Sequence, residues 1–262
     1  MPATFPSHAA AVLGLKLWRP RRFDGVALVV GSAAPDAAYP LAGIVSLPET
    51  HTLPALFWFC LPVTLLGTGL VRWAAPTVAA HLPRRPAALA LRDYGVLGSV
   101  RHPWPVTVWS ALLGAASHLM WDGFTHDPRG HGWLSAQIRE LQRDGLFGLP
   151  WWVVTDHLST VLGALVVLGI TVLIGRRRLL RRWHGLPADG GARAPGVFWS
   201  AAAAVATLYP LTWPLLPFPW SAHVQGVRML WAVALGLLAG VAATRVARRR
   251  GSPRIGSARS TR

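Results

Sequence analysis

Three side chains that commonly bind metal ions lie at regular spacing in the segment SHLMWDGFTH, residues 117–126. His118, Asp122 and His126 are separated by steps of four residues. Each step turns a helix through about 400°, so the three side chains form one stripe on one face. Two imidazoles and one carboxylate in such a stripe can bind a divalent metal such as zinc or manganese. The alternative is that they hydrogen-bond to neighbouring helices as polar glue.

Further ionisable residues stand in or beside apolar sequence, where a charge is costly unless it has a partner. Asp36 lies in GSAAPDAAYP, His51 lies between two threonines, and Asp156 and His157 begin a long apolar run. Each has a simpler interpretation when it is taken alone. Asp36 can cap a helix after Pro35, and a single histidine such as His51 often sits at a membrane interface.

The elements that must position these residues are apolar blocks of about 20 residues, the length that spans a bilayer. The chain is 52% hydrophobic and 14% charged, whereas soluble domains carry about 25% charged residues. We therefore expect an all-α polytopic membrane helix bundle with a short N-terminal helix over residues 5–18. The lipid bilayer is its expected partner. The expected transmembrane spans are 26–47, 54–74, 106–125, 152–175, 197–217 and 226–247.

The distribution of basic residues predicts an orientation. All but four of the 26 basic residues lie in gaps or termini that six spans place on one side of the bilayer. The positive-inside rule makes that side cytoplasmic and places both termini there. This also explains the net charge of +16 without a nucleic-acid partner. We expect one membrane-embedded domain over residues 1–247 and a disordered basic tail over residues 248–262.

This orientation brings His51, His126 and His157 to the same outer face, with His118 and Asp122 within about two helical turns of it. His8 does not fit as simply. Either it is not a ligand, or residues 5–18 fold back into the bundle as a re-entrant helix. Residues 133–146 are expected to form an amphipathic helix on the outer surface. The remaining histidines are expected to be solvated or interfacial: His81, His102, His131, His184 and His223.

Five motifs occur in an order that resembles a family of bacterial membrane proteins, domain-of-unknown-function family 4184. The resemblance covers roughly residues 1–245. The motifs are Pro6-Ser7-His8-Ala9-Ala10, Gly31-Ser32-Ala33-Ala34-Pro35-Asp36, His51-Thr52-Leu53-Pro54, Gly114-Ala115-Ala116-Ser117-His118-Leu119-Met120-Trp121-Asp122-Gly123-Phe124-Thr125-His126 and His157-Leu158-Ser159-Thr160.

The same pattern looks like that of inner-membrane proteins predicted to be metal-dependent hydrolases, and its His-x-x-x-Asp step is similar to one in zinc-dependent phospholipase C. The resemblance implies a bacterial cytoplasmic membrane location. One departure is Ala37-Ala38-Tyr39, since an aromatic residue often directly follows the Asp36 position. The metal ligands that the resemblance implies are His8, Asp36, His51, His118, Asp122, His126 and His157.

Two functions of different classes follow. The first is a metal-dependent hydrolase with one or two divalent metals, zinc or manganese, in which Asp36 or Asp122 serves as the general base. Its position near the headgroups favours a phosphoester or lipid-linked substrate. The second is a non-catalytic membrane protein with a structural metal or polar network, or a transporter. A transport path needs ligands spread along the membrane normal, whereas these candidates gather near one face.

Overall fold

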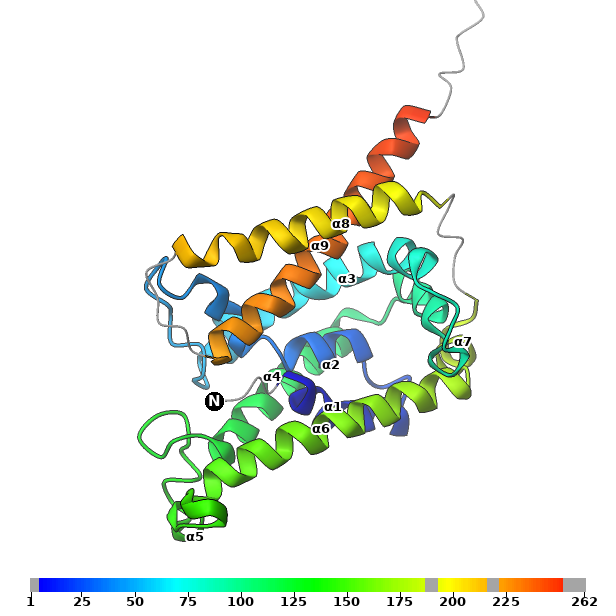
Figure 1. The fold of residues 1–262 in the computed structure, drawn as a ribbon. Helices are drawn as coiled ribbons and strands as arrows, with labels where there is room; N and C mark the ends of the chain where they lie inside the picture. The colour runs from blue at the N-terminus through cyan, green and yellow to red at the C-terminus, as the bar shows by residue number, and fades with distance from the viewer. Residues whose placement is uncertain (1–4, 187–192, 216–221, 252–262) are drawn as a thin grey trace, which may run out of the picture.

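The computed structural model describes residues 5–186, 193–215 and 222–251, and over these ranges the fold is all-α (Figure 1). The described residues contain two isolated backbone bridges but no strand. The longer helices are α1 Phe5–Trp18, α3 Leu61–His81, α4 Trp104–Thr125, α6 Trp151–Arg176, α8 Pro195–Leu211 and α9 Ala222–Gly251. The shorter ones are α2 Gly25–Gly31, α5 Arg139–Gln142 and α7 Leu179–His184. The 3-10 helices are η1 Pro35–Leu41, η3 Ala87–Leu89, η4 Leu91–Gly98, η5 Leu146–Gly148 and η6 Trp213–Leu215, and η2 Leu56–Cys60 is a π-helix.

Three of the described helical stretches are long and apolar enough to cross a membrane: Leu56–His81, Trp151–Arg176 and Val224–Arg250. They match the second, fourth and sixth expected spans. Much of their surface is apolar and exposed, as on α6, where Val161, Leu165 and Leu168 each have more than half of their area accessible. A soluble bundle would bury such a row, whereas a lipid-facing helix leaves it in contact with acyl chains. The chain is therefore a membrane protein.

The expectation of six spans is corrected to three. Residues 26–47 do not form a spanning helix, because α2 ends at Gly31 and η1 follows with Pro35 at its start and Pro40 inside it. Proline removes a backbone donor and clashes with the preceding turn, which stops a long α-helix. In place of the expected span 197–217, α8 has 17 residues and ends at Leu211, next to Pro210.

The third expected span is present as the helix α4, but it is not apolar enough over its length to count as a membrane span. Its buried face carries Thr107, Ser110, His118 and Asp122. Polar side chains inside a bundle are tolerated when neighbouring helices satisfy them. The low hydropathy of α4 therefore comes from the same polar residues that could bind a metal or form hydrogen bonds inside the bundle.

Close contact between α2 and α4 forms the base of the site. A Cβ added at Gly31 would lie 2.5 Å from the backbone oxygen of Ala111, and one at Gly114 would overlap the backbone oxygen of Leu28. Only glycine lets two helix backbones approach this closely. The crossing brings the end of α2, with the carbonyl of Ser32, against the middle of α4.

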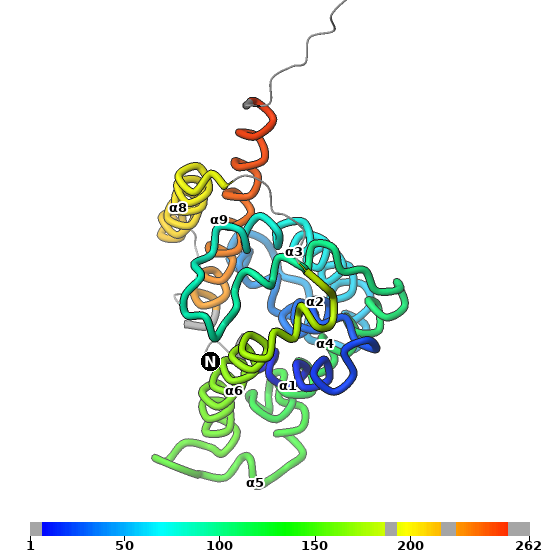
Figure 2. Tube along the Cα trace, turned by 90° about the vertical axis from the view of Figure 1, so that its right-hand side faces the viewer, coloured from blue at the N-terminus to red at the C-terminus, as the bar shows by residue number. Residues whose placement is uncertain are grey.

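The helix α1 lies along α6 in both views, beside α2 and α4 (Figures 1 and 2). Its first turn reaches the middle of α6, where a Cβ at Gly163 would overlap Ser7. The segment that the sequence expected to be a short helix is thus confirmed as one. It is packed inside the bundle rather than lying free beside it.

Three local expectations need correction. Residues 133–146 contain only the single helical turn α5, so the expected amphipathic helix does not form. His81 is buried rather than solvated, with Nδ1 2.8 Å from the carbonyl oxygen of Thr77 and its ring stacked on Phe198 at 4.4 Å. The helix α9 continues to Gly251, which makes the first residues of the expected tail helical. Residues 252–262 lie outside the described residues.

Candidate metal centre

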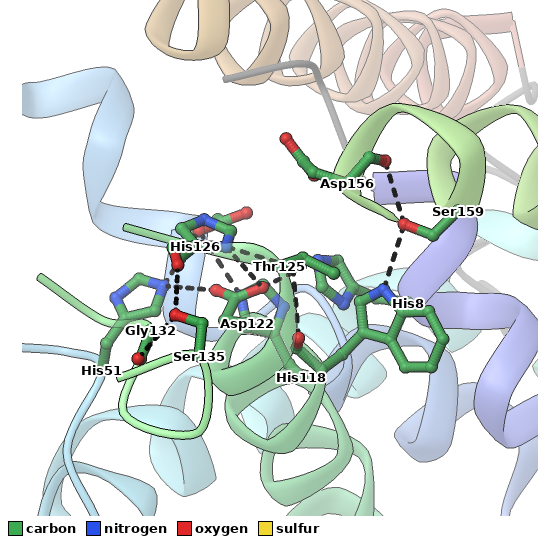
Figure 3. Close-up of polar contacts among 12 residues, drawn as sticks. His8, His51, His118, Asp122, Thr125, His126, Gly132, Ser135, Asp156 and Ser159 are labelled. Atoms are coloured by element: carbon green, nitrogen blue, oxygen red, sulfur yellow. Dashed lines mark hydrogen bonds and ion pairs between the residues drawn. The ribbon is translucent and has the colours of Figure 1, made fainter. Parts of the chain in front are cut away.

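The carboxylate of Asp122 lies among four imidazoles (Figure 3). Its Oδ2 is 3.1 Å from Nε2 of His118 and 3.6 Å from Nε2 of His51. Its Oδ1 is 3.5 Å from Nε2 of His8 and 3.7 Å from Nδ1 of His126. The Asp122 side chain is 3% exposed, so this is a buried carboxylate in contact with four histidines. We call these five residues together with Asp36 the His/Asp cluster.

Asp36 joins the cluster from η1. Its Oδ1 lies 3.2 Å from Nε2 of His51 and 3.6 Å from Nε2 of His118. Two overlapping sets of three ligand atoms, each within 4.8 Å of one another, result: His8, His118 and Asp122, and Asp36, His51 and His118. The structure thus brings together six of the seven ligands that the sequence proposed.

The end of α4 and the loop after it fix the last of these histidines. His118 and Asp122 share one helix face, whereas His126 is the C-cap of α4 and has extended backbone angles. The following loop folds back onto the helix, because the amides of Leu134 and Ser135 both donate to the carbonyl of Gly123 at 3.0 and 2.8 Å. The Ser135 hydroxyl also donates to the carbonyl of His126 at 2.7 Å, which holds that residue against the cluster.

The tautomer of His118 follows from one hydrogen bond. Its Nδ1 lies 2.8 Å from the carbonyl oxygen of Ser32, and a carbonyl can only accept, so Nδ1 carries the proton. In the neutral ring the lone pair is then on Nε2, which faces Asp36 and Asp122. Metal-binding histidines are typically oriented in this way by a backbone carbonyl.

The spacing of the ligand atoms fits a metal ion. Two donors that each lie about 2.1 Å from one tetrahedral zinc ion are about 3.4 Å apart. The nitrogen-to-oxygen distances around Asp122 run from 3.1 to 3.7 Å. In addition, Oδ1 of Asp122 is buried and makes no hydrogen bond to any described group. Buried polar atoms without hydrogen bonds are costly, and coordination of a cation satisfies them.

The position of His8 decides between the two interpretations of the N-terminal helix. Its ring is 1% exposed and stacks on the ring of His118, with centroids 3.8 Å apart and planes 22° apart. The segment 5–18 therefore folds back into the bundle and delivers His8 to the cluster. Because His8 and His118 are more than 100 residues apart in the chain, neither spacing nor local pattern could indicate this contact.

A second loop histidine stands at the edge of the cluster. The ring of His131, which the sequence left as solvated or interfacial, stacks on the ring of His51 with centroids 4.5 Å apart. Burial, followed by repulsion from His51, lowers the pKa of His131 below its usual value. The opposite side of His51 faces Tyr39, whose ring centroid is 5.8 Å away. His131 and Tyr39 are thus wall residues that the sequence analysis missed.

The structure does not bring His157 into the cluster. Its side chain is exposed and its Nδ1 lies 2.8 Å from the carbonyl oxygen of Val153, one turn back along α6. The neighbouring Asp156 is buried instead, and its backbone carbonyl accepts from the hydroxyl of Ser159 at 2.9 Å (Figure 3). One residue turns a helix by about 100°, so adjacent residues cannot both face inward.

Comparison with known proteins places the chain in a family without an assigned activity. The model of the family described as domain of unknown function (DUF4184) matches residues 1–247, nearly the whole chain. No curated protein matches the chain, and no solved structure does. The matched range contains all six residues of the His/Asp cluster. The chain therefore belongs to the DUF4184 family.

Proposed function

We propose that this protein is a membrane-embedded, metal-dependent hydrolase whose active site is the His/Asp cluster. The observation that carries the proposal is the buried Asp122 carboxylate with four imidazole nitrogens 3.1–3.7 Å from its oxygens. A metal centre needs several lone pairs that converge, and imidazole nitrogens and carboxylate oxygens from several segments of the chain supply them here. The His/Asp donor set favours zinc or manganese.

The residues divide into ligands and a proton acceptor. His8, His118 and Asp122 form the more deeply buried set of ligand atoms, and His51 and His126 complete the shell. A divalent metal bound there supplies Lewis acidity and lowers the pKa of bound water toward about 7. We assign the general base to Asp36, because its side chain is 11% exposed, against 3% for Asp122, and is more accessible to water. Nε2 of His51 lies 3.2 Å from Oδ1 of Asp36, so the proposed base stands directly beside a proposed metal ligand.

His118 can bind only one metal ion. Because its Nδ1 is bonded to Ser32, only Nε2 remains as a ligand, although both candidate sets of ligand atoms contain this residue. A single metal uses one set completely. If two metals bind, His118 would hold only one of them, and the carboxylates of Asp36 and Asp122 would supply negative charge to the pair.

The proposed substrate class is a phosphoester or a lipid-linked molecule. The cluster lies at the end of the bundle that holds the loop between α4 and α6, close to where the apolar span Trp151–Arg176 begins. Arginines gather at the other end of this span, after Arg176, so the positive-inside rule makes the cluster's end the outer face of a bacterial cytoplasmic membrane. A site near the headgroup level is close to the ester and phosphoester bonds of lipids, which favours a lipid-linked substrate over a soluble one.

A non-catalytic metal site is the second candidate, and the closed environment of the cluster favours it. His8, His118 and Asp122 are each nearly inaccessible to solvent. Structural zinc sites are closed by protein ligands, whereas catalytic sites keep one position open. Transport has less support, because the six cluster residues gather at one end of the bundle instead of lining a path across it.

Metal content tests the shared premise. Protein purified in mild detergent is expected to contain one or two equivalents of zinc or manganese by inductively coupled plasma mass spectrometry. The variant His157→Ala, which removes a histidine outside the cluster, should retain the wild-type content. Hydrolysis of bis-(p-nitrophenyl) phosphate that depends on the metal supports the catalytic function. Bound metal without hydrolysis of any phosphoester tested supports the structural site, and wild-type protein without stoichiometric metal eliminates both.

The orientation is tested with a single introduced thiol. Cys60 is fully buried, so the wild-type chain should react little with a membrane-impermeant maleimide. Arg139→Cys, in the exposed turn α5, is expected to label in intact spheroplasts. Arg177→Cys, exposed at the opposite end of α6, should label only after the membrane is opened. The reverse pattern would overturn the predicted orientation.

A further inference from the structure

A basic pocket lies at the opposite end of the bundle from the His/Asp cluster. Its volume is about 410 Å³, within the range of small-molecule sites. It lies between the turn after α1, the segment before α4, and α7, the helix labelled at one end of the bundle in Figure 1. Its charged and aromatic lining residues are Arg21, Arg101, His102, Arg182, Trp183 and His184.

The described lining residues of the pocket carry a net positive charge. No acidic side chain is among its described lining residues, and Arg21, Arg101 and Arg182 form no ion pair within the described part of the chain. Two neighbouring arginines are paired instead: Arg178 and Arg181 lie 3.1 and 2.7 Å from the carboxylate of Asp93. Three guanidinium groups around one cavity repel one another, and a bound anion removes that repulsion.

Neighbouring contacts shape the pocket. The guanidinium of Arg101 donates to the carbonyls of Gly98 and Val100 at 3.0 and 2.9 Å, which holds it in place. Beneath the pocket, the ammonium of Lys16 donates to the carbonyls of Pro20 and Phe23 at 2.6 and 2.9 Å. These bonds fix the turn that presents Arg21. Hydrogen bonds to backbone carbonyls therefore hold the pocket lining in place. The other guanidinium nitrogens of Arg101 stay available to a ligand.

The two histidines respond to this positive environment. Burial, and then repulsion from Lys16 and His102, lowers the pKa of His184 to about 4. Burial and then Lys16 also lower the pKa of His102. Both imidazoles are thus neutral at pH 7, and they add hydrogen-bonding capacity to the charge that the arginines supply. Paired guanidinium groups with neutral donors nearby suit the oxygens of a phosphate.

We propose that the basic pocket binds the phosphate group of an anionic phospholipid headgroup. The pocket stands where α6 ends at Arg176, which is the level at which a spanning helix leaves the hydrocarbon layer. Trp183 in its wall is the residue type that settles at this interface. Basic pockets at the cytoplasmic ends of membrane helices are suited to anionic headgroups. A soluble phosphate compound offers the same chemistry, so the experiment must separate the two sources.

The test measures thermal unfolding of the full chain in detergent micelles. Added phosphatidylglycerol is expected to raise the wild-type Tm by about 5 °C, whereas phosphatidylcholine does not. Arg21→Gln with Arg182→Gln should lose that rise and keep the wild-type Tm in phosphatidylcholine. The matched double variant, Arg139→Gln with Arg143→Gln, removes two exposed arginines at the other end and should keep the rise.

Three outcomes count against the proposal. An equal rise in both double variants would show that phosphatidylglycerol acts through general surface charge. A rise with glycerol 3-phosphate but none with phosphatidylglycerol would assign the pocket to a soluble ligand. The absence of any rise in the wild type would show that the pocket binds neither. If the double variant does not fold, Arg21→Gln and Arg182→Gln alone serve, each expected to reduce the rise by about half.

Discussion

Asp122→Asn is expected to weaken metal binding by more than about 100-fold. Loss of a partner that only supports a metal ligand commonly costs 10- to 100-fold, and Asp122 lies among the ligands themselves. Asparagine keeps the size of the side chain but removes the negative charge that faces four imidazoles. Competition with a fluorescent zinc chelator measures the affinity, and mass spectrometry measures the residual content.

The control for this change is Asp127→Asn. Asp127 lies in the loop just after the cluster, where its carboxylate accepts from the amide of Arg129 at 2.8 Å. Because its side chain is exposed to solvent, metal content should stay at the wild-type value. A chelator should lower the Tm of the wild type and of Asp127→Asn but not that of Asp122→Asn. An Asp122→Asn variant with full metal content would remove Asp122 from the ligand shell.

Asp24→Ala is expected to lower the free energy of unfolding by about 3–5 kcal/mol, the usual cost of breaking a buried ion pair. Asp24 is 1% exposed and pairs with the guanidinium of Arg72, which is 16% exposed. Its carboxylate also accepts from the hydroxyl of Thr107 at 2.8 Å and caps α2 through the amides of Val26 and Ala27. Alanine removes all of these contacts and leaves the charge of Arg72 uncompensated.

Equilibrium unfolding in mixed micelles with increasing dodecyl sulfate measures this loss. Asp24→Asn keeps an acceptor for the cap but loses the charge, so it should fall between the wild type and alanine. Glu140→Ala is the control, because Glu140 and Arg143 are 3.9 Å apart and 71% exposed, and surface pairs of this kind contribute little. If Asp24→Ala and Glu140→Ala are equally stable, the Asp24 network does not hold α2, α3 and α4 together.

The sequence predicted the elements that long, uninterrupted apolar runs specify. The fourth expected span, 152–175, differs from α6 by one residue at each end, and the sixth, 226–247, lies within α9. The first span failed because residues 26–47 are apolar for another reason. Their first part is enclosed by other helices, with Ala27, Leu28 and Ala34 buried, and Pro35 and Pro40 then stop the long helix. Hydropathy responds in the same way to burial in protein and burial in lipid.

The cluster was predictable where its residues share one helix and unpredictable where they meet across the chain. The stripe of His118, Asp122 and His126 followed from helical spacing. His51 was expected near this face, but its contact with Asp36 at 3.2 Å depends on the short helix η1 and the loop after it. His8 required a helix that folds back, and the choice of Asp156 over His157 as the buried residue depends on the rotation of α6.

The stacking of His8 on His118 has a consequence for biogenesis. During synthesis, the residue that closes the cluster leaves the ribosome first, long before α4 has been translated and inserted. His8 must therefore wait undocked while α2 and α4 assemble around Gly31 and Gly114. The cluster then becomes complete only in the finished bundle. Insertion of the polypeptide should thus proceed normally in cells starved of the metal, and loading should follow as a separate, late step of maturation.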